Sequence, residues 1–462
     1  MLESMTPSAS MTTAVRRMPK TSGLPLIGSL PQLLRDPFGF VAHARATHGD
    51  IYRLNLGLIN VVVLNQPRHA QYVLRDNAAN YSKSGPMWNA VRGMLGNGLV
   101  VSEGDFWLRQ RRMMQPQFHR QRLVALQTLM VEAIAEALDS WEESADGATP
   151  FDLTPGFNRL TMKVIVRTLF GTGLTAKEMD DTAEAMTYAL DFLMKAILVE
   201  PLPRWLPVPG RKKYQQALAR FDEIVYGIIA QCRAGKLSDD HLLAMLLDVV
   251  DEETGEGMTD QQLRDEVATL FLAGYETTSL ALSWALHHLM QHPEMMTKMQ
   301  AEVDSVLNGR QPTLADLPQL PYTRMVLQEA MRLQPPSYWL PRTAVADDEI
   351  DGYHISAGTQ VVSLTYMYHR HPEHWENPEQ FDPERFTPER SANRHRYAWI
   401  PFGAGQRLCI GRDFAMMEGQ LALAMVAQRF NMTAVPDHEV KPMLSSTMRP
   451  KNGVMVTLEK RA

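Results

Sequence analysis

A single cysteine in a glycine-rich loop, directly before an amphipathic helical stretch, constrains this chain more than any other feature of its sequence. The loop reads Phe402-Gly-Ala-Gly-Gln-Arg-Leu-Cys409-Ile-Gly411. A thiolate at a helix N-terminus lies near unpaired N–H groups and the positive end of the helix dipole, and both lower the thiol pKa. The glycines let the backbone approach a flat ligand closely. The loop therefore predicts a metal-bound thiolate at Cys409.

By itself, a lone cysteine is usually a small buried hydrophobe. The full pattern Phe-x-x-Gly-x-Arg-x-Cys-x-Gly favours the ligand, and it resembles the haem-ligand loop of the cytochrome P-450 superfamily. Gln406 is a departure, because many members carry proline there, although bacterial fatty-acid hydroxylases of the family also have glutamine. The resemblance implies a haem whose iron is bound by Cys409 and which contacts four more loop residues, Phe402, Gly403, Arg407 and Gly411.

The composition bounds the class of protein. The chain has 462 residues, 45% of them hydrophobic, which is enough for one large core. A net charge of −6 gives no case for nucleic-acid binding. Two distant cysteines, Cys232 and Cys409, fit a reducing cytoplasm better than a disulfide framework. Residues 1–20 read as a polar arm, and no apolar run is long enough for a membrane anchor. We therefore expect a cytoplasmic protein without a stable membrane anchor.

The pattern along the chain predicts a mainly α fold with a smaller β part. Strand-like segments at residues 51–56 and 60–64 are separated by Gly57 in the manner of a hairpin. Helical periodicity dominates residues 105–332, and strand signals return at 343–368 and 453–458. Since no repeat or linker divides the chain, we expect one α+β domain over residues 21–462.

One long central helix is predicted from Thr259, which begins a capping box with Gln262, to Gln291 before His292-Pro293. Its middle carries Ala273-Gly274-Tyr-Glu276-Thr277. A mid-helix glycine costs roughly 1 kcal/mol against alanine, so we expect Gly274 to be compensated by the close approach of a flat cofactor.

The same helical segment carries an acid and an alcohol side by side. Glu276 and Thr277 could relay protons, although a packing notch beside a solvated glutamate would leave the same sequence. Together with the cysteine loop, the segment resembles the oxygen-activating part of the family's central helix. The resemblance implies that Ala273, Gly274, Glu276 and Thr277 take part in catalysis.

Glu329 and Arg332 are opposite charges at positions i and i+3 of a predicted helix, a spacing also found in common surface pairs. Their order before Phe381-Asp-Pro-Glu-Arg-Phe386 resembles the family's buried glutamate–arginine pair, joined here by Arg385. The resemblance implies a buried ion triad that supports folding of the cofactor pocket and takes no part in the chemistry.

Other positions are assigned by the resemblance alone. It implies that the haem propionates are held by Trp107, Arg111, Arg342 and Arg407, because carboxylates require such donors. It also implies a mainly apolar substrate pocket lined by Met87, Trp88, Leu99, Val100, Leu272, Ala273, Ser337, Tyr338, Trp339, Ser446 and Thr447.

A basic stretch lies between Phe106 and Val131, which contains no acidic residue but five arginines, Arg109, Arg111, Arg112, Arg120 and Arg122. On an acidic chain this stretch is compatible with a docking face for an acidic electron-transfer protein, or equally with solvated helix charge. No Gly-x-Gly-x-x-Gly motif follows a predicted strand, so we expect no flavin or nicotinamide domain in the chain.

The resemblance covers roughly residues 20–460 and implies a P-450 fold with a b-type haem between the central helix and the helix after the cysteine loop. It implies a monooxygenase that inserts one oxygen atom of O2 into a hydrophobic molecule such as a fatty acid or terpenoid. Electrons would come from NAD(P)H indirectly, through a reductase and a ferredoxin or flavodoxin. Two alternatives stay open: a peroxide-driven hydroxylase, which the Glu276-Thr277 pair disfavours, and a non-enzymatic haem-binding sensor.

Overall fold

The structure is a computed structural model, and it describes residues 16–57, 59–171, 175–199, 203, 207–236, 241–443 and 445–461. Its helices are α1 (Leu30–Arg35), α2 (Pro37–His48), α3 (Pro67–Gln71), α4 (Pro86–Leu95), α5 (Gly104–Met114), α6 (Arg120–Asp139), α7 (Leu153–Phe170), α8 (Ala176–Val199), α9 (Arg211–Arg233), α10 (Leu242–Leu247), α11 (Asp260–Gln291), α12 (Pro293–Leu307), α13 (Pro321–Leu333), α14 (Thr365–Tyr368), α15 (Pro388–Ser391) and α16 (Arg412–Arg429).

The strands are shorter and lie mostly near the two ends of the chain. They are β1 (Ile51–Leu56), β2 (Ile59–Leu64), β3 (Tyr81–Ser82), β4 (Asp146–Asp152), β5 (Leu340–Ala344), β6 (Asp348–Ile350), β7 (Tyr353–Ile355), β8 (Gln360–Ser363), β9 (Phe430–Ala434), β10 (Pro442–Met443), β11 (Arg449–Pro450) and β12 (Met455–Lys460). The mainly α architecture with a smaller β part confirms the expected fold class.

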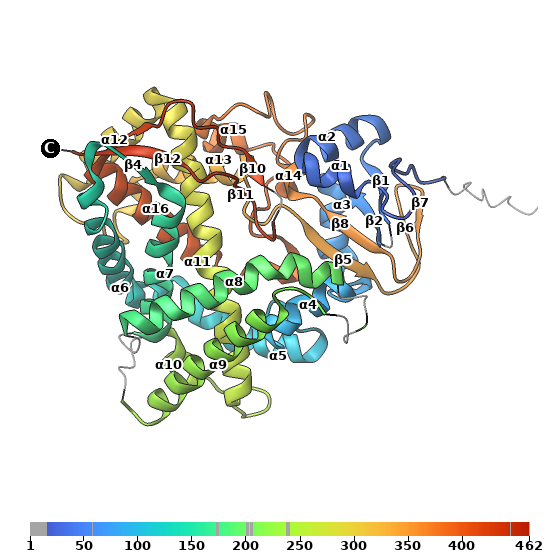
Figure 1. Cartoon of the computed structure of the whole chain (residues 1–462), viewed down its shortest axis with the longest axis horizontal. Helices are drawn as coiled ribbons and strands as arrows, with labels where there is room; N and C mark the ends of the chain where they lie inside the picture. Colours follow the sequence, from blue (N-terminus) through green and yellow to red (C-terminus); the bar gives the residue numbers. More distant parts are fainter. Residues whose placement is uncertain are drawn as a thin grey trace, which may run out of the picture.

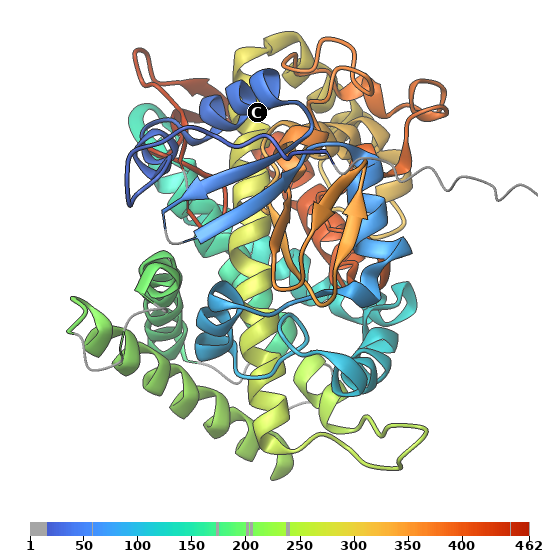
Figure 2. The same ribbon diagram turned by 90° about the vertical axis from the view of Figure 1, so that its right-hand side faces the viewer.

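The central helix α11 runs through the whole molecule and is in contact with α7, α9, α13 and α16 (Figures 1 and 2). Thr259 caps its start, since its side chain accepts the Gln262 N–H while the Gln262 side chain accepts the Thr259 N–H. The helix ends at Gln291, before His292. Both predicted ends are therefore confirmed, and the 32 residues span about 48 Å at ~1.5 Å per residue.

A five-stranded sheet in the order β1-β2-β8-β5-β3 lies to one side of the helices (Figure 1). The predicted hairpin forms its edge, with Ile51 opposite Leu64 and Leu56 opposite Ile59. Residues 16–20, predicted as part of the polar arm, lie along this sheet region: the Arg53 N–H donates to the Pro19 carbonyl and the Arg16 N–H to that of Gly352. Residues 1–15 lie outside the described part of the chain.

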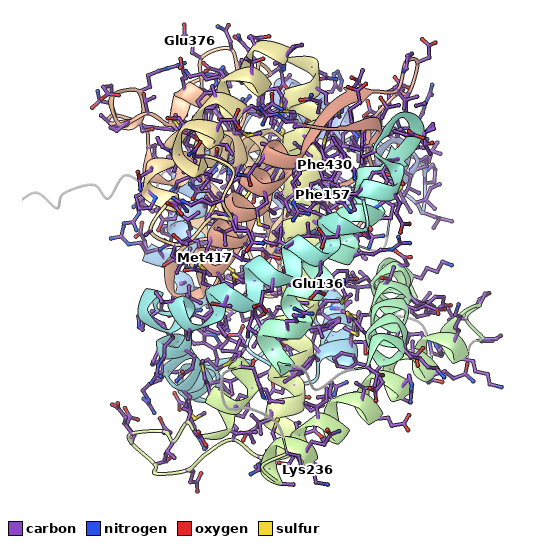
Figure 3. All side chains as sticks on the ribbon, turned by 90° about the vertical axis from the view of Figure 1, so that its left-hand side faces the viewer. Glu136, Phe157, Lys236, Glu376, Met417 and Phe430 are labelled. Carbon is purple, nitrogen blue, oxygen red and sulfur yellow. The ribbon has the colours of Figure 1, made fainter. Side chains whose placement is uncertain are left out.

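A second sheet, β4-β12-β9, brings the C-terminal strand against the middle of the chain. Strand β4 lies inside the region that was predicted as mostly helical, because its pairing with β12 joins residues about 300 apart. Trp141 packs here against the rings of Phe157 and Phe430, with centroids 5.1 and 6.1 Å away (Figure 3 labels both phenylalanines). The end of the predicted 343–368 strand region is also helical, as the short helix α14.

None of the described helices combines the length and the apolar character that crossing a membrane would require.

Replacing Thr259 by alanine should lower the free energy of unfolding by about 1 kcal/mol, because the first turn of α11 loses its side-chain acceptor. Urea unfolding followed by circular dichroism measures the change. Thr259→Ser keeps the hydroxyl and should unfold like the wild type. An unchanged midpoint for Thr259→Ala would show that the cap does not stabilise the helix.

Candidate active site

The cysteine loop is held in one conformation by its own backbone and by a neighbouring segment. The Cys409 N–H donates to the Phe402 carbonyl at 2.9 Å, which closes the loop. Gly405 has φ +67°, and a Cβ on it would lie 1.8 Å from the carbonyl oxygen of Leu74. Glycine is therefore required there by both conformation and space. Helix α16 starts directly after the loop, with Gly411 at its N-cap (Figure 1).

A cavity with an empty volume of about 880 Å³ lies between α11 and the cysteine loop. Its walls bring together segments far apart in the sequence: Lys83, Leu99, Val100, Trp107, Arg111, Phe118, Ile165, Leu242, Thr269, Leu270, Ala273, Gly274, Thr277, Thr278, Arg407, Cys409, Ile410, Gly411, Phe414 and Ala415. The cavity therefore contains the predicted cysteine ligand, part of the predicted oxygen-activating segment and part of the predicted propionate set.

The Cys409 side chain is exposed, but it opens into this cavity and protein surrounds it on every side. Burial raises the pKa of the Cys409 thiol, while the Gly411 N–H and the charges of Arg111 and Arg412 lower it. The predicted net lowering is therefore wrong for the protein alone, because desolvation outweighs the helix terminus. A cation at the sulfur would supply the charge that favours a thiolate, so the position suits a metal ligand.

Cations gather at one rim of the cavity. Lys83, Arg342 and Arg407 act on one another electrostatically and share one carboxylate, Glu103, whose Oε2 lies 3.1 Å from Arg407. Burial and the neighbouring guanidinium of Arg407 lower the pKa of Arg342 to about 10. Burial lowers the pKa of Lys83 well below its usual value. The cations outnumber the one carboxylate, and the surplus of positive charge suits the propionates of a haem.

The predicted propionate partners Trp107 and Arg111 also line the cavity. The Arg407 guanidinium lies over the Trp107 ring, 3.9 Å from its centroid. Arg111 donates to the Leu408 carbonyl at 3.0 Å and lies close enough to influence the Cys409 thiol. The donor set therefore fits a haem: a thiol for iron, and guanidiniums and an ammonium for carboxylates. A haem bound by these residues supplies dioxygen activation, which a thiolate ligand favours by electron donation.

Helix α11 presents Ala273 and Thr277 to the cavity, one turn apart, and the Thr277 hydroxyl donates to the Ala273 carbonyl at 2.6 Å. Gly274 lines the cavity too, but the space for its missing Cβ is filled by Ile165 of α7, whose Cδ1 would lie 2.7 Å away. The close approach predicted for a flat cofactor is therefore made by a packed helix, and Gly274 is a helix-packing residue.

Glu276 is not among the residues that line the cavity. Its buried carboxylate accepts from Arg449 Nε at 2.6 Å, and Arg449 also binds Asp191 of α8 at 2.6 Å. Burial raises the pKa of Glu276, whereas Arg449 and Thr447 lower it. The predicted Glu276–Thr277 pair is thus divided: Thr277 faces the cavity and Glu276 joins α11 to β11 and α8.

The predicted triad forms in the interior. Arg332 binds Glu329 through Nε at 2.6 Å and Nη2 at 2.8 Å, and Arg385 Nε lies 3.3 Å from the same carboxylate. Both members of the first pair are fully buried. Arg332 also donates to the carbonyls of His369 and Pro378. The structure therefore brings these three residues together as a structural cluster away from the cavity.

His369 connects this triad to the segment before the cysteine loop. Its Nε2 accepts the Ile400 N–H at 2.9 Å, so its Nδ1 carries the proton and donates to the Arg332 carbonyl at 3.2 Å. Burial lowers the pKa of His369 to about 3, which keeps it neutral. The triad thus holds the backbone two residues before Phe402.

The predicted substrate pocket is divided between two cavities. Leu99, Val100 and Ala273 line the cavity beside Cys409, whereas Met87, Tyr338 and Trp339 line a second, apolar cavity with Ile197 at the end of α8. The Nζ atom of Lys83 lies over the Trp88 ring, 4.9 Å from the centroid of that ring. Five predicted lining residues belong to neither set of wall residues: Trp88, Leu272, Ser337, Ser446 and Thr447.

The predicted basic docking stretch does not present uniform positive charge. Arg112 binds Asp251 at 2.7 Å and Glu253 at 2.6 Å, and Arg109 lies 3.3 Å from Glu256. Acids from the segment before α11 therefore neutralise both arginines, while Arg111 lines the cavity. Arg122 is exposed, and the Arg120 side chain lies outside the described residues.

Sequence reasoning missed Lys83 and Thr269, which both line the cavity. Lys83 Nζ donates to the Val100 carbonyl at 2.6 Å. The Thr269 hydroxyl is buried without a hydrogen-bond partner among the described residues. Thr269 lies four residues before Ala273, so the helical period could have indicated it. Lys83 lies in a loop, where no periodicity indicates direction.

Comparisons with known proteins agree with this site. The cytochrome P450 family model matches residues 18–458. Cyclooctat-9-en-7-ol 5-monooxygenase of Streptomyces melanosporofaciens is 35% identical over 438 residues, 94% of each chain. Pentalenene oxygenase of Streptomyces avermitilis is 31% identical and covers 92% of this chain and 93% of its own. The crystal structure of the cytochrome P450DA heme domain has a TM-score of 0.88 at 28% identity, covering 96% of this chain and 98% of that one.

A thiol in the wall of a cavity beside a central helix, with cations for carboxylates, defines a haem-thiolate protein. The chain belongs to the cytochrome P450 family. It is a haem-thiolate monooxygenase that uses dioxygen, acts on a hydrophobic small molecule and takes its electrons from a redox partner.

Replacing Glu329 by glutamine should destabilise the protein by about 3–5 kcal/mol, because Arg332 and Arg385 stay buried without their anion. Urea unfolding and the haem content of the purified protein measure the loss. Glu384→Gln removes an exposed pair with Lys298 and should change stability by less than about 0.5 kcal/mol. Equal stability of the two variants would exclude a structural role for the triad.

Replacing Lys83 by methionine should weaken haem retention about 10- to 100-fold, since a charge-assisted hydrogen bond contributes about 1.5–3 kcal/mol. Haem transfer to apomyoglobin measures the loss. Lys213→Met, which removes an exposed lysine, is the control. If both variants lose haem at the wild-type rate, Lys83 does not bind the propionates.

Proposed function

We propose that this monooxygenase hydroxylates a neutral terpenoid and that a ferredoxin or flavodoxin, reduced by an NAD(P)H-dependent reductase, supplies the electrons. The main support for a neutral terpenoid substrate is the second cavity. Its walls consist of apolar and uncharged side chains, among them Leu30, Phe38, Met87, Ile197 and Trp339. A fatty acid would bring a carboxylate into these walls without a cation to bind it.

The cavity beside Cys409 supports the same substrate class. The cations of its wall, Lys83, Arg111 and Arg407, suit the haem carboxylates, while Leu99, Val100 and Ala273 offer apolar surface. Two relatives carry names of enzymes that oxidise terpenoids, Cyclooctat-9-en-7-ol 5-monooxygenase and Pentalenene oxygenase. The cytoplasm, which the two-cysteine composition fits, is the proposed compartment.

The proton supply in this proposal rests on Thr277. Its hydroxyl lies in the cavity wall one turn from Ala273, and it can pass a proton from water to a reacting group there. Glu276 helps to fix the position of Thr277, because it is the preceding residue of α11 and is held in place by Arg449.

A spin-state titration of the ferric holoenzyme tests the substrate class. Cyclic terpenoids should produce a saturable low- to high-spin shift, whereas saturated fatty acids of similar carbon number should bind more weakly by at least about tenfold, because a buried unpaired carboxylate is costly. The reverse preference would contradict the terpenoid proposal and leave the monooxygenase class intact.

Replacing Thr277 by alanine should uncouple electron use from product formation. NAD(P)H oxidation should continue while product per NAD(P)H falls several-fold and hydrogen peroxide rises, because protons are no longer delivered in order. Thr277→Ser keeps a hydroxyl and should retain most of the coupling. Unchanged coupling in Thr277→Ala would contradict the proton role, and equal turnover with peroxide alone would favour a peroxide-driven enzyme.

A further inference from the structure

The wall of the Cys409 cavity includes a segment, Gly96–Ser102, that connects α4 to α5. Leu99 and Val100 of this wall segment line the cavity. Its backbone turns back on itself, since the N–H groups of Val101 and Ser102 both donate to the Gly98 carbonyl. The placement of these two side chains therefore depends on what holds the backbone of the segment.

Charged side chains hold this backbone from both sides. On one side, three cations bind successive carbonyls: Lys83 binds that of Val100, Arg92 that of Val101 and Arg407 that of Ser102, at 2.6–2.8 Å. On the other side, two consecutive acids of α11 accept N–H groups. Asp265 accepts that of Asn97 at 2.8 Å, and Glu266 accepts that of Leu99 at 2.9 Å.

The two acids differ in what they touch. Asp265 also accepts from Gln261 and Arg264, and the residue it holds, Asn97, is exposed. Glu266 is 1% exposed, and its described hydrogen bond goes to Leu99, a wall residue of the cavity. Burying a carboxyl costs free energy, so we infer that the contact of Glu266 with Leu99 has a function.

We propose that Glu266 is a positioning residue that sets substrate selectivity by fixing the Leu99 backbone, and with it the Leu99 and Val100 side chains, against the reacting end of the cavity. The proposal rests on the monooxygenase function but needs no particular substrate class. The segment offers little room to settle elsewhere, because a Cβ on Gly98 would lie 2.2 Å from the Thr269 hydroxyl of α11. The wall segment therefore sits directly on α11, and Glu266 fixes its distance from Ala273, which lies about two turns further along the same helix.

Glu266 acts through its acceptor oxygen and not through its charge. Burial raises the pKa of Glu266 to about 8, opposed by the Leu99 N–H, so the carboxyl is largely protonated at neutral pH. Glutamine reproduces both its acceptor oxygen and its donor. Methionine has a similar length and no acceptor, so Glu266→Gln and Glu266→Met form a matched pair.

The first measurement is amide hydrogen exchange of the haem-loaded proteins, with fragmentation that separates Asn97 from Leu99. In Glu266→Met the Leu99 amide should exchange about tenfold faster, because its acceptor is gone. The Asn97 amide, held by Asp265, should keep its wild-type rate and is the internal control. Glu266→Gln should match the wild type at both positions. Unchanged Leu99 exchange in Glu266→Met would overturn the proposal.

The second measurement is selectivity, with any compound that gives the spin-state shift. Glu266→Met should change the ratio of hydroxylated products and raise KM, while kcat changes less and the thiolate spectrum stays intact. Glu266→Gln should keep the wild-type ratio of hydroxylated products. Faster Leu99 exchange with an unaltered product ratio would show that the segment is held but does not select. An equally altered ratio in Glu266→Gln would point to ionisation and also overturn the proposal.

Discussion

The burial of three cations beside a single carboxylate is the constraint on which the rest of the site depends. Lys83, Arg342 and Arg407 are drawn from three distant segments and meet at one rim of the cavity, with Glu103 between them. Such a cluster repels itself unless further anions enter. The protein is thus built with a charge imbalance that its cofactor corrects, and haem binding and stability of this region are two aspects of one equilibrium.

The scaffold that presents the cysteine is itself a network of buried charge. Glu329, Arg332 and Arg385 satisfy one another and the carbonyls of the surrounding loop, and neutral His369 extends the network to Ile400. Glu329 and Arg332 are paired in a place where water could not supply a partner. The position of Cys409 is therefore fixed by interactions that begin on α13.

Local signals predicted much of this molecule. The capping box at Thr259, the hairpin at residues 51–64 and the cysteine loop each lie within a few residues of sequence, so turn and helix chemistry specify them directly. The triad was predicted through resemblance. Contacts that join distant segments were not predictable: Arg449 reaches Glu276 from 173 residues away, and β4 pairs with the C-terminal strand. Nothing in the local sequence around Glu276 shows that Arg449 will pair with it.

The packing of α7 on α11 shows what the glycine at position 274 means for the site. Ile165 fills the place of its missing side chain, the Thr161 hydroxyl donates to the Tyr275 carbonyl at 2.7 Å, and Ser279 binds Asn158 at 2.5 Å. These contacts follow one another along the two helices, which run antiparallel. A slide of α7 by one residue would break both hydrogen bonds and press Ile165 onto a side chain. The packing of α7 on α11 therefore has a single register, and the two helices together set the shape of the cavity wall opposite Cys409.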